Sequence, residues 1–139
     1  MYLVDTNIWL ERLLEQERWE EVRDFLDAFP SDYFSITDFA FHSIGIALCK
    51  LKKNEKFLQY IRDTFISGSV QLLHLRPNDS TKIVQVIDLY NLDFDDAYQY
   101  TIAEKYDLQI VSFDTDFDKT PRGRMTPREI LNTLQQKTN

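Results

Sequence analysis

The chain has 139 residues, of which 43% are hydrophobic and 14% aromatic, and its formal net charge is −7. This length fits one compact domain with a sizeable core, so we expect a single domain over residues 1–139. The composition argues against intrinsic disorder, and no segment approaches the ~18 unbroken apolar residues of a membrane-spanning helix. The acidic net charge argues against a simple nucleic-acid binder, because phosphate contacts come from Lys and Arg.

The charge is unevenly distributed along the chain. Residues 119–139 contain five basic side chains and one acidic side chain, a net of +4, so residues 1–118 carry −11. Acidic residues gathered in a site that binds cations are compatible with a phosphate-bearing partner once the cations are bound. The net charge alone therefore neither establishes nor excludes a protein that acts on nucleic acid.

The cysteine content and the first residues predict a cellular setting. One cysteine, Cys49, cannot form an intramolecular disulfide, and its apolar neighbours in IGIALCKL predict a buried thiol. The opening MYLVDTNIWLE has neither a basic region nor a cleavage site of small residues, so we expect no secretory signal there. These features predict a reducing, cytoplasmic setting with no membrane association.

The first half of the chain alternates strand-like and helix-like segments. The apolar run YLVD predicts a buried strand at residues 2–5, and YFSI predicts a second strand at 33–36. Apolar residues at helical spacing predict two helices between these strands, with a break near residues 15–17 and an end at Pro30. Further helices are predicted at residues 37–51 and 54–67.

The second half repeats this alternation. VQLLHL predicts a third strand at residues 70–75, LQIVSF a fourth at 108–113, and residues 124–126 are a candidate short fifth strand. Helices are predicted at about residues 80–90 and 95–106, and from Pro127 onward. Strands joined by helical segments of this length form right-handed crossovers. We therefore predict a three-layer α/β/α domain with a central parallel sheet of four or five strands.

Acidic residues lie at the carboxyl ends of the predicted strands. Asp5 ends the first strand, and Asp38 follows the second. Asp114 and Asp116 follow the fourth, and Asp96 opens the helix that leads into it. The carboxyl ends of parallel strands share one edge, where open α/β sheets bind their ligands. Carboxylates gathered there repel one another, and Mg²⁺ or Mn²⁺, which prefer oxygen ligands, are the usual compensation.

Such a site has a defined chemistry. A bound divalent cation lowers the pKa of water and stabilises charge on phosphoryl oxygens, which is the chemistry of phosphodiester hydrolysis. Each acid also has a structural alternative: a helix cap for Asp5 or Asp38, a helix-dipole contact for Asp96, and a solvated loop position for Asp114. The coincidence of acids at three strand ends favours the metal site over separate structural explanations.

The order of these motifs resembles the PIN domain, a family of metal-dependent nucleases. LVDTN at residues 3–7 is similar to the opening motif of the family, and FDDAYQYTIAEKYDLQIVSFDTDFD at residues 94–118 is similar to its closing block. The resemblance spans nearly the whole chain, and the closing block is its most specific part. It implies that Asp5, Asp96 and Asp114 bind the metal. The supporting positions that it implies are Asn7, Ser112 and Asp116.

One position departs from the family pattern. The family often carries a Glu three residues after a Thr, in the helix that follows the second strand, and counting from Thr37 that position is Ala40. We expect Asp38, in the first turn of the same helix, to replace the missing acid and complete the catalytic site. His42, four residues later on the same helical face, is a candidate supporting residue.

The resemblance implies a Mg²⁺- or Mn²⁺-dependent endoribonuclease that cleaves RNA phosphodiesters with metal-activated water. Lys119, Arg122 and Arg124 follow the last acids and are candidate RNA contacts at the rim of the site. Small single-domain members of this kind resemble the toxins of bacterial toxin–antitoxin pairs (VapC-like). That similarity implies an antitoxin partner and a homodimer.

Two alternatives stay open at this stage. A phosphotransfer domain of the receiver or dehalogenase type also has acids at strand ends, but it needs an acid pair or Asp-x-Asp where this chain has Asp-Thr-Asn. A PIN-like domain with weak or no activity would instead bind RNA or a protein partner. Ala40 and the net charge of −7 favour this second alternative.

Overall fold

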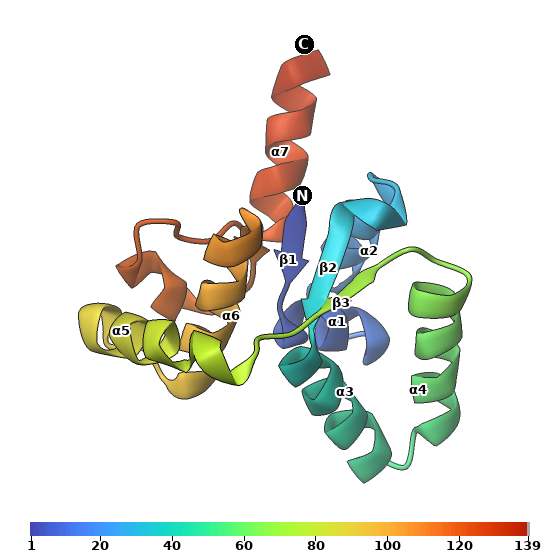
Figure 1. The fold of residues 1–139 in the computed structure, drawn as a ribbon. Helices are drawn as coiled ribbons and strands as arrows, with labels where there is room; N and C mark the ends of the chain where they lie inside the picture. The colour runs from blue at the N-terminus through green and yellow to red at the C-terminus, as the bar shows by residue number, and fades with distance from the viewer. Residues whose placement is uncertain (139) are drawn as a thin grey trace.

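A computed structural model describes residues 1–138 and contains one parallel sheet with helices on both faces (Figure 1). The strands are β1 (Tyr2–Val4), β2 (Phe34–Thr37), β3 (Gln71–Leu73) and β4 (Gln109–Val111). They lie in the order β3-β2-β1-β4, and all three pairings are parallel. The four predicted strands and the three-layer α/β/α architecture are confirmed.

The predicted fifth strand is a single parallel bridge. Met125 pairs with Val111, and its N–H donates to the Ile110 carbonyl at 2.9 Å. The Ser112 N–H in turn donates to the Met125 carbonyl at 3.1 Å. This bridge fixes the segment that follows β4 beside Ser112.

Pairs of helices connect successive strands. β1 is followed by α1 (Thr6–Leu13) and α2 (Trp19–Asp27), and β2 by α3 (Asp38–Lys50) and α4 (Asn54–Ile61). A π-helical turn (Arg62–Ile66) extends α4. β3 is followed by α5 (Ser80–Tyr90) and α6 (Phe94–Tyr106), and α7 (Pro127–Thr138) ends the described chain. The predicted break between the first two helices is confirmed, because Glu15 adopts the left-handed conformation (φ 48°).

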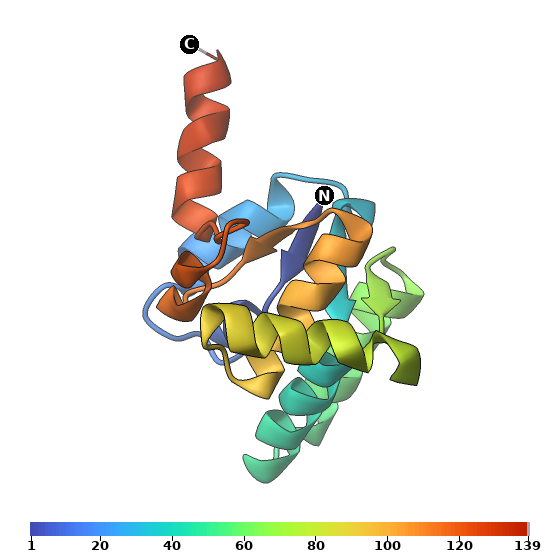
Figure 2. The same ribbon diagram turned by 60° about the vertical axis from the view of Figure 1, so that its left-hand side comes forward.

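Two apolar cores cover the two faces of the sheet. Figure 2 shows α5 and α6, in yellow and orange, on one of these faces. One core contains Phe25 and Ile44 and packs α1 to α4 on one face, and the other contains Tyr100 and packs α5 and α6 on the opposite face. Successive residues of a strand point to opposite faces, so Leu3 joins the second core and Val4 the first. Burial on both faces explains the apolar runs of the central strands β1 and β2 and of β4, whereas the edge strand β3 is largely exposed.

The order of the strands creates a switch point beside β1. The chain proceeds from β1 to β2 and β3 on one side, and then crosses back to place β4 on the other side of β1. Open parallel sheets bind their ligands where the connections diverge in this way, outside the carboxyl ends of the strands. Here that point lies between β1 and β4, next to Asp5 and Ser112.

The surface differs from the expectation at one position. Cys49 is exposed, so the prediction of a buried thiol is wrong: α3 turns Ile44 and Leu48 towards the core, and Cys49 lies on its outer side. No helix within residues 1–138 combines the length and the apolar character needed to cross a membrane. Helix α7 projects from the body at the end of the sheet where the N-terminus lies (Figures 1 and 2).

Candidate metal centre

An open hollow of about 280 Å³ lies at the carboxyl edge of the sheet. Acids from three parts of the chain line it: Asp5 after β1, Asp95 and Asp96 at the start of α6, and Asp114 after β4. The other lining residues are Thr6, Asn7, Leu10, Phe39, Ser43 and Gln99. The structure therefore brings Asp5, Asp96 and Asp114 to one place, while Asp38 and His42 are not among the residues that line it.

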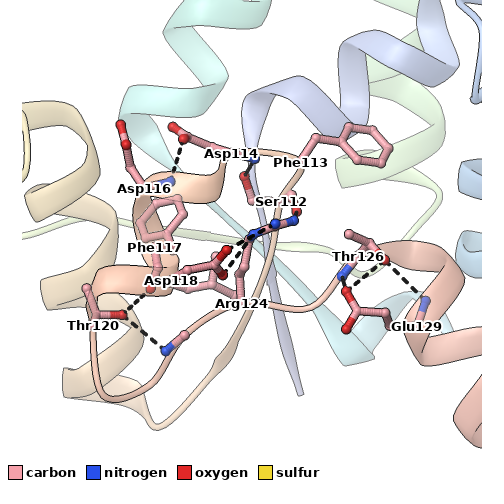
Figure 3. A network of polar contacts seen from close by, with 12 residues as sticks. Ser112, Phe113, Asp114, Asp116, Phe117, Asp118, Thr120, Arg124, Thr126 and Glu129 are labelled. Carbon is pink, nitrogen blue, oxygen red and sulfur yellow. Dashed lines mark hydrogen bonds and ion pairs between the residues drawn. The ribbon is translucent and has the colours of Figure 1, made fainter.

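The tightest group of carboxylates consists of Asp96, Asp114 and Asp116, one oxygen of each lying within 4.8 Å of the others. Asp114 opens a 3₁₀ turn, η4 (Thr115–Lys119), and its Oδ1 accepts a hydrogen bond from the Asp116 N–H at 2.9 Å. The two side chains consequently lie side by side (Figure 3). Three carboxylates at this spacing supply the hard oxygen donors that suit Mg²⁺ or Mn²⁺. Asp116, predicted as a supporting residue, is thus a candidate ligand.

Asp5 is buried, and four donors hold its carboxylate. Oδ1 accepts from the Thr6 N–H (2.7 Å) and Gln99 Nε2 (2.8 Å), and Oδ2 accepts from Ser112 Oγ (2.7 Å) and Asn7 Nδ2 (3.5 Å). Burial raises the pKa of Asp5, and these hydrogen bonds lower it in part. Asp5 therefore acts as the N-cap of α1 and also lines the hollow.

Ser112 and Asn7 connect the ends of β1 and β4. The Ser112 hydroxyl donates to Asp5, and it accepts from Asn7 Nδ2 (3.2 Å) and from the Asp114 N–H (2.9 Å). Asn7 Oδ1 accepts from the Phe113 N–H (3.2 Å). These contacts fix the backbone that carries Asp114 relative to Asp5.

Asp96 also lies in an unfavourable environment for a negative charge. Asp96 is only 8% exposed. Burial, followed by repulsion from Asp114 and Asp5, raises the pKa of Asp96 to about 7. An environment of this kind is relieved when a cation binds beside the carboxylate.

Asp38 has other partners. Its Oδ1 accepts from the Phe39 N–H and from the Tyr98 hydroxyl, both at 2.9 Å. The Tyr98 oxygen accepts from the Leu75 N–H, also at 2.9 Å, so Asp38 and Tyr98 join α3 and α6 to the end of β3. The N-cap of α3 is Thr37, which accepts from the Ala40 N–H.

Helix α3 turns Phe39 and Ser43, one turn apart, towards the hollow. In the described part of the chain, α3 therefore contributes no carboxylate to the lining of the hollow. His42 is exposed and contacts the Phe41 ring. The replacement of the missing family Glu by Asp38 stays a prediction; in the structure the Asp38 carboxylate contacts Phe39 and Tyr98.

We expect Tyr98→Phe to lower the free energy of unfolding by about 1–3 kcal/mol, because it leaves the Leu75 N–H without its acceptor and removes one of the two donors to Asp38. Urea unfolding in the presence of a chelator measures this change. Tyr106→Phe, at a 45% exposed position of the same helix, is the matched control. Unchanged stability of Tyr98→Phe together with lost Mn²⁺ binding would instead assign Asp38 and Tyr98 to the metal centre.

Two of the predicted basic residues lie close to the acids or behind them. Lys119 Nζ lies 3.6 Å from Asp116 Oδ1. Arg124 pairs with Asp118 and donates to the Ser112 carbonyl at 3.1 Å (Figure 3). Lys119 therefore borders the acids, whereas Arg124 supports the segment that carries them.

Arg122 lies elsewhere. It donates to Asp107 Oδ1 (2.8 Å) and to the Leu108 carbonyl (3.3 Å), just before β4 begins. A turn at Gly123, with φ at +61°, redirects the chain after Arg122. Arg122 is thus at the amino end of the strands, opposite the hollow.

Gln99 is a residue of the hollow that the sequence motifs did not identify. It follows Asp96 by three residues on α6, is 3% exposed, and donates to Asp5. The available signal was its helical spacing from Asp96, which places the two side chains on one face.

The protein resembles known families and structures over most of its length. A toxin-antitoxin complex from Klebsiella pneumoniae contains a chain with 22% identity and a TM-score of 0.73, covering 91% of this chain and 98% of that one. FitAcB from Neisseria gonorrhoeae gives 19% identity and a TM-score of 0.73, with coverages of 92% and 99%. Mycobacterium tuberculosis VapC20 is described as a Sarcin-Ricin loop cleaving toxin. It gives 15% identity and a TM-score of 0.71, with coverages of 85% of this chain and 93% of that one.

These identities establish a shared fold. The comparison with curated proteins finds no match. A family model for the PIN domain matches residues 2–123, a range that includes the whole acidic hollow and the bulk of the sheet and its helices. The chain belongs to the PIN domain family.

Proposed function

We propose that this protein is a Mg²⁺- or Mn²⁺-dependent endoribonuclease. The observation that carries this proposal is the convergence of oxygens from Asp96, Asp114 and Asp116 within 4.8 Å, beside the buried Asp5 at the switch point of the sheet. Membership in a family of nucleases supports hydrolysis of a phosphodiester bond. RNA as the substrate is proposed from the fold shared with a toxin described as cleaving the Sarcin-Ricin loop.

The residues of the hollow have distinct roles in this proposal. Asp96, Asp114 and Asp116 would hold the cation, and Asp5 would complete its surroundings. A bound Mg²⁺ or Mn²⁺ supplies activated water and neutralises developing charge on the phosphoryl oxygens. Ser112 fixes the backbone of Asp114 and the carboxylate of Asp5 in one orientation.

Proton release accompanies cation binding at this site. With a pKa of about 7, Asp96 is about half protonated at neutral pH before the cation binds. A cation held by Asp96 would compete for the oxygen that carries this proton, so Asp96 would be deprotonated when it holds the cation. Lys119, already 3.6 Å from Asp116, is placed to contact a substrate phosphate next to the acids.

We further propose that the protein is the toxin of a toxin–antitoxin pair in the cytoplasm. The support is the fold shared with chains from the Klebsiella complex and from FitAB bound to DNA. This proposal implies an antitoxin that binds the protein and blocks cleavage, and a homodimer as the free form. Co-expression with the product of a neighbouring small reading frame, followed by co-purification and a cleavage assay, tests the pairing.

A cleavage assay on single-stranded and structured RNA tests the proposed activity. The wild-type protein should produce defined fragments with Mg²⁺ or Mn²⁺ and none with a chelator. DNA of the same sequence is the control for the sugar. Fragments that persist in chelator, or the absence of fragments with both metals and all RNAs, would contradict the proposal.

We expect Mn²⁺ to raise the melting temperature of the metal-free protein by about 5–10 °C at a concentration of about 100 times its dissociation constant, because it binds the folded state selectively. Thermal unfolding in the presence of Mn²⁺, compared with thermal unfolding in the presence of a chelator at the same ionic strength, measures the shift. A variant with unchanged core, Asp116→Asn, should show a smaller shift. Equal melting temperatures of the wild type with and without Mn²⁺ would contradict the assignment of the acidic hollow as a metal centre.

One observation favours the alternative of a weakly active module that binds RNA or protein. Helix α3 presents Phe39 and Ser43 to the hollow and has Ala40 at the position where the family often has a Glu. A site with one acid fewer binds its cation more weakly. The two functions differ in one measurement: the module binds RNA without cleaving it at any Mn²⁺ concentration.

A further inference from the structure

Gln99 joins two walls of the hollow. Its Nε2 donates to Asp5 Oδ1 at 2.8 Å, which links the second turn of α6 to the end of β1. The other side-chain donors to Asp5 are Ser112, after β4, and Asn7, on α1. Gln99 is therefore the contact through which the helix that carries Asp96 acts on the Asp5 carboxylate.

The other end of this amide is unsatisfied. Gln99 Oε1 is buried and, among the residues from 1 to 138, has no hydrogen-bond partner. A buried carbonyl without a partner is costly, and native proteins contain few such groups. An apolar side chain of similar length would fill the same volume without this cost. Packing alone consequently does not explain a glutamine at position 99.

The charge of Asp5 fixes the orientation of the amide. When Asp5 is ionised, as it would be beside a bound cation, its carboxylate only accepts hydrogen bonds. Nε2 must then face Asp5, because the reverse orientation would set Oε1 against a negative oxygen. Gln99 Nε2 and the Thr6 N–H converge on the same oxygen, Oδ1, at 2.8 and 2.7 Å. The two donors together determine how the Asp5 carboxylate is turned within the hollow.

We infer that Gln99 is a positioning residue of the metal centre, whose Nε2–H orients the Asp5 carboxylate towards the cation held by Asp96, Asp114 and Asp116. This inference rests on the proposed function. A hydrogen bond from outside the ligand set typically changes metal affinity or activity about 10–100-fold, because it fixes the orientation of the inner carboxylate. The unpaired Oε1 is the cost that accompanies this arrangement.

The first test is the Mn²⁺ affinity of Gln99→Met, measured by isothermal titration calorimetry. Methionine keeps the length of the side chain and removes the donor, so we expect binding about 10–100-fold weaker than in the wild type. Gln109→Met is the matched control, because Gln109 donates to the Ile110 carbonyl and lies at the amino end of β4. Its Mn²⁺ affinity should change by less than about twofold.

The second test asks whether Gln99 acts through Asp5. In an Asp5→Asn background, Gln99→Met should change Mn²⁺ affinity by less than about twofold, because the group that it positions is altered already. Urea unfolding midpoints in chelator provide a second double-mutant cycle. They are measured for the wild type, Gln99→Met, Asp5→Asn and the double variant, and they stay measurable even when Asp5→Asn binds no Mn²⁺. Effects that combine independently in both cycles would overturn the inference.

The remaining outcomes also decide. Gln99→Leu serves as a second variant if Gln99→Met does not fold, and failure of both to fold would make Gln99 structural and overturn the inference. Normal Mn²⁺ binding by wild type and by Gln99→Met alike would overturn the inference alone. A wild-type protein that binds no Mn²⁺ would contradict the proposed function, and the inference with it.

Discussion

Asp114→Asn should abolish Mn²⁺-dependent RNA cleavage, with a loss of about 10³-fold or more, and leave the metal-free protein at least as stable as the wild type. The loss corresponds to about 4 kcal/mol of transition-state stabilisation, the scale that a catalytic cation supplies. The stability is retained because asparagine keeps the Oδ1 that accepts from the Asp116 N–H and removes repulsion towards Asp96. Cleavage rates and urea unfolding in chelator measure the two effects.

The matched control for this prediction is Asp88→Asn. Asp88 is exposed on α5, so its substitution makes the same change in net charge away from the hollow. Its cleavage rate should stay within about twofold of the wild type. If Asp114→Asn unfolds the metal-free protein while Mn²⁺ does not stabilise the wild type, Asp114 is a structural residue and the interaction module becomes the better account.

The second large effect is a pH dependence that originates at Asp96. The folded-state pKa of about 7 lies above the value of about 3.9 for an unfolded chain, so the folded protein binds this proton more tightly. The associated stability is fully present below about pH 4 and is lost as the pH rises through 7. Relative to Asp96→Asn, the metal-free wild type should lose about 2–4 kcal/mol of unfolding free energy between pH 4 and pH 8.

Urea unfolding of the wild type and of Asp96→Asn in chelator, at unit steps of pH, measures this difference. The comparison with the variant removes the contributions of other titrating groups that the two proteins share. Mn²⁺ affinity of the wild type should also fall, by about tenfold for each pH unit below 7, as protons compete for Asp96. Parallel stability curves for the two proteins would contradict the raised pKa.

The sequence predicted the fold and the location of the site because both depend on patterns that local physics enforces. Strands buried on both faces are continuous apolar runs, and the intervening helices require parallel crossovers. The acid that ends β1 and the acid that follows β4 therefore had to share an edge, whereas the direct pairing of these two strands is known only from the structure. Asp5 and Asp114 were predictable from this rule.

The membership of the tightest acidic group depended on local geometry that no periodicity reveals. The short 3₁₀ turn that begins at Asp114 brings Asp116 to the centre, whereas a more open loop would have left it in solvent. From the sequence alone, Asp38 could equally well bind a metal or accept a hydrogen bond from a hydroxyl group. Its actual partner, Tyr98, lies 60 positions away in the chain. Arg122 is held at the opposite edge by Asp107, a contact that the sequence pattern did not reveal.

The central strand of the sheet has a consequence for the order of assembly. β1 is made first, yet its partner β4 supplies Ser112, whose bond to Asp5 joins residues 107 positions apart. A parallel sheet contains no hairpin, so each strand contact closes a long loop and forms slowly. On a ribosome, β1 would keep one unpaired edge until most of the chain had emerged. The acidic hollow is therefore incomplete until β4 and the turn after it have emerged, and a chain that ends before β4 carries Asp5 and Asp96 without Ser112, Asp114 and Asp116.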